Sequence, residues 1–96
     1  MEIQKGQLPL QSTVESDPRA IEILTVWIAN SKQHVSLDVR PWPDPGHWGI
    51  MLVDLAKHIA NAYAQSGRLD RETALQRLKL AFDAEWNFPT DSPSGA

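Results

Sequence analysis

The sequence predicts a small α+β domain that is predominantly helical, with three helices and a minor β element between the first and the second. Three observations support this prediction. Long segments repeat their apolar residues at helical spacing, one short segment alternates apolar and polar residues, and prolines separate the two kinds of pattern. A chain of 96 residues has room for one domain with a thin core.

The domain is expected to span residues 17–88, preceded by an extended arm over residues 1–16 and followed by a flexible tail over residues 89–96. The arm shows no hydrophobic periodicity and contains Gly6 and Pro9. The tail, PTDSPSGA, has the composition of a disordered end.

The first helix is predicted to begin at Asp17 and Pro18 and to end near Asn30 and Ser31. Asp is a favoured N-cap residue, and Pro is tolerated at the first helical position. The apolar residues that follow recur at the spacing of one helix face; they are Ala20, Ile21, Ile23, Leu24, Trp27 and Ile28.

The β element is predicted from the alternation of Val35, Leu37 and Val39 with polar neighbours. A single strand leaves its backbone groups unpaired. Its partner is therefore expected to be either the arm around residues 3–10 or the same strand of a second copy related by a two-fold axis. The proline-rich segment 40–46 then interrupts regular structure.

Two further helices are predicted, from Asp44 and Pro45 to about Ser66 and from Asp70 to about Asn87, and their short connection makes them an antiparallel hairpin. Gly67 suits the left-handed position that ends a helix. The earlier helix carries a broad apolar face, which indicates packing on more than one side; its members are Trp48, Leu52, Leu55, Ala56, Ile59, Ala62 and Tyr63. The later helix has the core stripe Leu75, Leu78, Phe82 and Trp86.

Composition excludes several classes of function. Nine basic and twelve acidic residues give a net charge of −3, which argues against binding to nucleic acid. The chain has no cysteine, and therefore no disulfide, thiol nucleophile or thiolate metal site. It has neither an apolar run long enough for a membrane span nor a signal-peptide pattern, so a cytoplasmic protein without membrane contact is expected.

Three segments carry a resemblance to a known family: QHVSL at residues 33–37, WGIMLVDLAKHIANAY at residues 48–63 and FDAEW at residues 82–86. The sequence from about Asp17 to Asp91 resembles a family of short bacterial proteins that is catalogued only as a domain of unknown function. The resemblance implies a bacterial origin and a self-contained domain. It implies no activity, cofactor or catalytic residue.

One candidate site lies on the predicted second helix. Asp54 and His58 are four residues apart on one face, so they could share a metal ion or act as an acid–base pair, with His34 as a third ligand. The alternative is an ordinary surface pair, because this face lies opposite the apolar one.

A second candidate site surrounds the start of the same helix, where Arg40, Trp42, His47 and Trp48 could hold an anion or small ligand. Against this, Asp44 is expected to cap the helix and to bring a competing negative charge. The tryptophans would then seal the core beneath a stiff loop.

The favoured interpretation is a small interaction or regulatory module without catalytic activity, with Val35, Leu37 and Leu80 as candidate interface residues. We expect it to be a homodimer; the alternative is a different protein as its partner. No Gly-rich phosphate loop or nucleotide-binding fingerprint is present, so no cofactor is expected. The alternatives are a small metal-dependent or acid–base enzyme and an anion binder, at the two sites described above.

Overall fold

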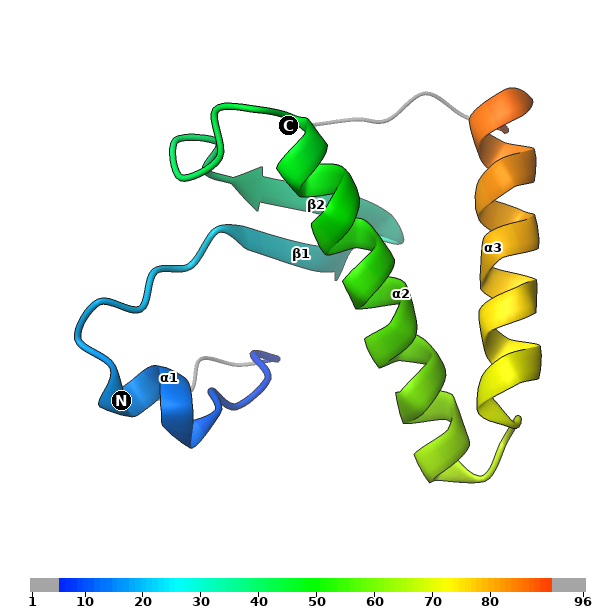
Figure 1. Cartoon of the computed structure of the whole chain (residues 1–96), viewed down its shortest axis with the longest axis horizontal. Helices are drawn as coiled ribbons and strands as arrows, with labels where there is room; N and C mark the ends of the chain where they lie inside the picture. Colours follow the sequence, from blue (N-terminus) through cyan, green and yellow to red (C-terminus); the bar gives the residue numbers. More distant parts are fainter. Residues whose placement is uncertain (1–5, 91–96) are drawn as a thin grey trace.

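The computed structural model describes residues 6–90 and confirms the predicted fold class, with three helices and a two-stranded antiparallel sheet between the first and the second (Figure 1). The predicted arm and tail lie partly outside the described residues. In chain order the elements are α1 (Ser12–Ser16), β1 (Leu24–Ala29), β2 (Lys32–Leu37), α2 (Gly46–Ser66) and α3 (Arg71–Asn87).

The predicted position of the first helix is wrong. Helix α1 is a five-residue turn inside the predicted arm, and the segment expected to be helical contains β1. Asp17 does not cap a helix: its carboxylate accepts the backbone N–H of Arg19 at 2.8 Å and its carbonyl accepts that of Ala20 at 3.1 Å, which makes a tight turn at Pro18.

Strand β1 forms because its sequence suits a strand and a partner lies next to it in the chain. The segment is rich in β-branched residues, and β2 pairs with it residue by residue, from Ala29 opposite Lys32 to Leu24 opposite Leu37. The two residues between the strands, Asn30 and Ser31, have φ values of 52° and 60°, the type I′ turn that matches strand twist. The partner of β2 within the chain is therefore β1, and the expected pairing with the arm is not found in its described residues.

The hairpin has one apolar face and one mixed face. On the mixed face, Trp27 lies opposite His34, and a Cβ added at Gly6 would lie 3.4 Å from the Trp27 ring, so the N-terminal arm approaches this face. The other face carries Gln33, opposite Ile28, and five apolar side chains that we call the apolar hairpin face: Leu24, Val26, Ile28, Val35 and Leu37.

Hydrogen bonds of Asp38 fix the backbone just after the end of β2. Its backbone N–H donates to the carbonyl of Ile23 at 3.0 Å, which extends the ladder by one bond. Its carboxylate accepts Nε and Nη2 of Arg40, each at 2.9 Å, and also the Arg40 backbone N–H at 3.0 Å. These bonds from Arg40 favour the charged carboxylate and lower the pKa of Asp38 to about 2.

Helices α2 and α3 form the predicted antiparallel pair, and their ends lie close to the predicted residues. Gly67 ends α2 with a φ of 75°, and the carboxylate of Asp70 caps α3 by accepting the Thr73 backbone N–H at 3.1 Å. Ala60 and Ala74 are buried between the helices, where small side chains allow close approach. The two helices are closest near the turn that joins them and separate toward their other ends (Figure 1).

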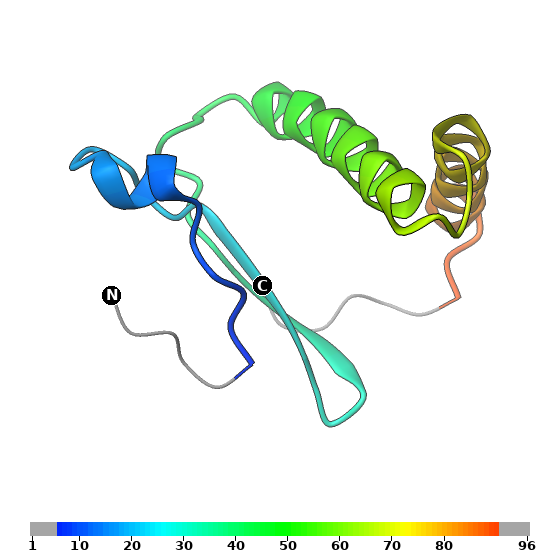
Figure 2. The same ribbon diagram turned by 90° about the horizontal axis from the view of Figure 1, so that it is seen from below.

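The hairpin and the helix pair are two separate layers. The Cα atoms of both strands lie more than 8 Å from every Cα atom of α2 and α3. Figure 2 shows the hairpin running away from α2, with its turn directed away from both helices. Among residues 6–90, Ala60 and Ala74 are the only buried apolar residues, so each layer leaves most of its apolar side chains uncovered.

Replacing Gly67 with Ala is expected to lower the free energy of unfolding by about 1 kcal/mol, because only the left-handed backbone opposes the change. An added Cβ would meet no atom within 4 Å. Gly49, inside α2, is the matched control: its added Cβ also meets nothing, and Gly49→Ala should raise the stability by roughly 0.5–1 kcal/mol. Urea unfolding at one fixed protein concentration measures both changes, and equal signs would contradict the assignment.

The Asp38 carboxyl is expected to titrate at about pH 2, which ¹³C NMR of the carboxyl carbon measures directly. The pKa is lower in the folded chain than the ordinary 3.8, so the stabilising contribution is present above that value and is lost as the pH falls toward 2. Arg40→Gln removes the charged donor and should move the titration back toward 3.8. An unchanged midpoint in this variant would show that Arg40 does not cause the shift.

Candidate functional site

Three of the four residues predicted to bind a ligand form an aromatic cluster at the start of α2. The rings of Trp42 and Trp48 meet edge to face with their centroids 5.3 Å apart, and those of Trp42 and His47 do so at 6.4 Å. The indole N–H of Trp48 is enclosed and finds no acceptor within the described residues. Edge-to-face packing of this kind joins the loop to the helix, which is the structural role considered above.

The fourth residue, Arg40, does not join the cluster. Its side chain is 88% exposed and holds the Asp38 carboxylate. The end of α2 is also occupied, because Asp44 accepts the Gly46 backbone N–H at 2.9 Å on its carboxylate and that of His47 at 3.1 Å on its carbonyl. A negative charge already lies where an anion would bind, so the geometry does not favour an anion site.

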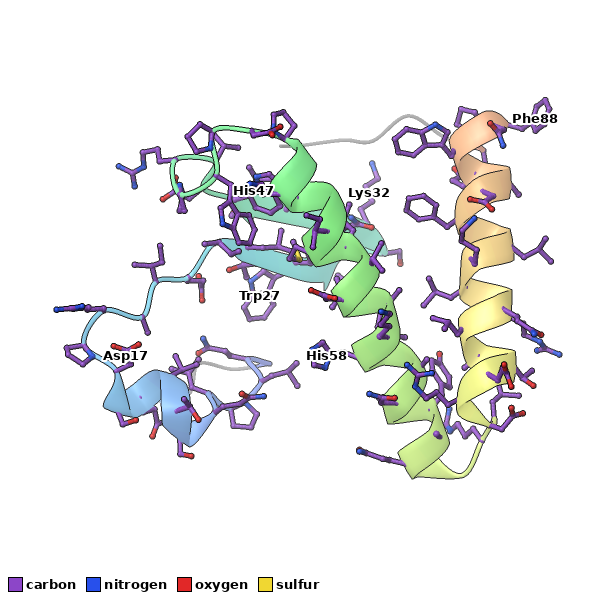
Figure 3. The ribbon with its side chains drawn as sticks, viewed as in Figure 1. Asp17, Trp27, Lys32, His47, His58 and Phe88 are labelled. Atoms are coloured by element: carbon purple, nitrogen blue, oxygen red, sulfur yellow. The ribbon has the colours of Figure 1, made fainter. Side chains whose placement is uncertain are left out.

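The three residues of the predicted metal site are not brought together. His34 lies on β2, where its Nε2 is 3.1 Å from the carbonyl oxygen of Ala29, whereas Asp54 and His58 lie on α2. Figure 3 shows His47 and His58 at separate positions along that helix. Within residues 6–90, no three His, Asp or Glu side chains are grouped closely enough to hold a metal ion.

The candidate interface residues occupy two different surfaces. Val35 and Leu37 both belong to the apolar hairpin face. Leu80 is 73% exposed on α3 and follows Leu78 by two residues, about 200° around the helix, so it points away from the stripe that contains Leu78. One contact surface cannot easily include all three residues.

The main surface feature is an uncovered apolar face on the helix pair, and we treat it as the candidate functional site. We call it the helix face; on α2 its side chains recur at positions i, i+3, i+7 and i+11 and are each 38–44% exposed. These residues are Leu52, Leu55, Ile59 and Tyr63. The breadth of the apolar face was the sequence signal for this surface, and what the sequence did not show is that the chain leaves it uncovered.

Aromatic residues continue the uncovered surface along α3. Phe82 and Trp86 stack with their ring centroids 5.8 Å apart at 21°. Trp86 is 75% exposed and Phe88, just beyond the helix, is 82% exposed. Large aromatic side chains in such exposed positions are typical anchors of protein–protein interfaces.

No helix within the described residues is both long enough and apolar enough to cross a membrane.

Two of three comparisons with known proteins match most of the chain. No curated protein matches the chain. A solved structure from the photosynthetic bacterium Rhodopseudomonas palustrus CGA009, described as that of a "putative pyruvate dehydrogenase", is 33% identical, with a TM-score of 0.71 over 98% of this chain and 92% of that one. The family described as Domain of unknown function (DUF5076) matches residues 7–90. The resemblance seen in the sequence is thereby confirmed, and the chain belongs to this family.

Proposed function

We propose that this chain is a non-catalytic interaction module that works as a homodimer. The observation that carries the proposal is the uncovered apolar surface of the helix face and the α3 aromatics. Large exposed apolar surfaces mark sites of association in soluble proteins.

The dimensions of the chain support association. The chain exposes 8664 Å², whereas a compact monomer of 10.7 kDa would expose about 5,500 Å². Its radius of gyration is 15.5 Å, against roughly 12.5 Å for a compact domain of this length. The excess of roughly 3,000 Å² per chain is more than the roughly 1,000–2,500 Å² per chain that permanent homodimers bury, so the exposed surface is large enough for such an interface.

A second copy is the simplest partner, because it offers the same apolar faces in a two-fold arrangement that closes. The name of the Rhodopseudomonas palustrus protein would suggest pyruvate chemistry instead. In the described part of this chain, however, the histidines do not converge and no cluster of acidic and imidazole groups forms. We also propose that the dimer acts in the bacterial cytoplasm, which the absence of cysteine and the bacterial source of the solved relative support.

Light scattering on a sizing column, across a concentration series, tests the proposal. We expect twice the chain mass of 10.7 kDa at micromolar concentrations, with dissociation coupled to loss of structure, because folding and association share the same apolar surface. A folded monomer at every concentration would overturn the proposal.

A matched pair of leucine variants locates the interface. Leu52→Lys places a charge on the helix face and should raise the dissociation constant at least tenfold, because burying an unpaired ammonium is unfavourable. Leu80→Lys makes the same chemical change on the other side of α3 and should change the dissociation constant by less than about threefold. If Leu80→Lys dissociated the dimer and Leu52→Lys did not, the interface would lie on the outer surface of α3.

A further inference from the structure

We propose that the dimer is built by exchange, with the apolar hairpin face of each copy packed on the helix face of the other. This inference rests on the proposed homodimer and adds which surfaces meet. It follows from two apolar surfaces in one chain that are each left partly exposed and are held apart by the segment between them.

The apolar hairpin face is only partly covered by its own chain. Leu24 and Val35 are half-buried, whereas Leu37 is 47%, Val26 is 50% and Ile28, nearest the tip, is 72% exposed. The opposite face of the hairpin is approached by the chain's own arm at Gly6, next to Trp27. The uncovered side of the sheet is therefore the apolar one. A two-stranded hairpin is only marginally stable until such a face is packed.

The helix face has the complementary shape and chemistry. It presents a row of aliphatic and aromatic side chains along α2, and a sheet face covers such a row in the packed layers of an α+β domain. Lys57, Asn61 and Gln65 lie on other sides of α2, so an apolar sheet could cover the row without burying a charge. Each chain thus carries both halves of one interface.

The connecting segment prevents the two halves from meeting within one chain. Pro41, Pro43 and Pro45 restrict its backbone, and the paired Asp38 and Arg40 secure its first residues to the end of β2. At the other end, Trp42 packs edge to face on Trp48 of α2. Closing the hairpin onto its own α2 would require these contacts to break.

The partner that covers both apolar faces is a second copy of the chain, because each copy carries both faces. If the hairpin of one copy covers the helices of the other, a two-fold axis places the second hairpin on the first helix pair, so both contacts form at once and no apolar face is left to propagate. These two contacts would bury part of the roughly 3,000 Å² per chain that a compact monomer would not expose. An unrelated partner would have to provide both surfaces itself.

Intermolecular paramagnetic broadening tests the exchange directly, because the native chain contains no cysteine. A nitroxide is attached to Ile28→Cys in unlabelled chains, which are then co-refolded from urea with ¹⁵N-labelled native chains. Only contacts between copies can broaden the ¹⁵N signals. We expect the amides of Leu55 and Ile59 to lose most of their intensity, and reduction of the nitroxide to restore it.

Two further labels keep the result interpretable. Lys32→Cys, also near the hairpin tip but on the opposite face, should broaden the same α2 amides if Ile28→Cys perturbs folding. Leu80→Cys, on the outer side of α3, should leave Leu55 and Ile59 sharp. A stable dimer with no broadening of α2 from either hairpin label would overturn the exchange while leaving the homodimer intact. A folded monomer by light scattering would overturn both.

Discussion

The rest of the structure depends on the stiff connection between β2 and α2. Its prolines restrict the backbone, Asp38 and Arg40 fasten one end to the hairpin, and the Trp42–Trp48 contact fastens the other to the helix. With both ends secured, the hairpin and the helix pair become separate layers. Each layer is internally well formed, yet each presents apolar side chains that the other does not cover.

The energetic consequence is that local backbone structure forms within one chain, whereas burial of its apolar side chains does not. The two strands pair residue by residue from Leu24 opposite Leu37 to Ala29 opposite Lys32, and both long helices run without interruption. Burial of apolar surface, which supplies most of the free energy that offsets lost chain entropy, is incomplete in one chain. A family member with this architecture would couple the completion of its core to assembly, so that stability depends on protein concentration.

The groups that carry chemistry in the sequence have mostly structural roles in the fold. The tryptophans and His47 join a loop to a helix, Arg40 neutralises Asp38, and Asp44 occupies the helix end that an anion would need. His34 lies beside a backbone carbonyl of its own hairpin. The surface that distinguishes this molecule is therefore apolar, and this is why we propose that its function lies in what packs on that surface.

The sequence by itself determined what depends on residues near one another in the chain. The ends of α2 and α3 were predictable because Gly67 and Asp70 act on the backbone within one turn of their own positions. The breadth of the apolar face on α2 was also readable, although its cover was not. Only the tertiary structure decided that Leu24–Ala29 is a strand, because its apolar residues fit both periodicities and pairing with β2 selects between them. The same holds for the candidate sites: spacing places Asp54 beside His58 on α2, but the distance from that helix to His34 depends on how the connecting segment orients the hairpin.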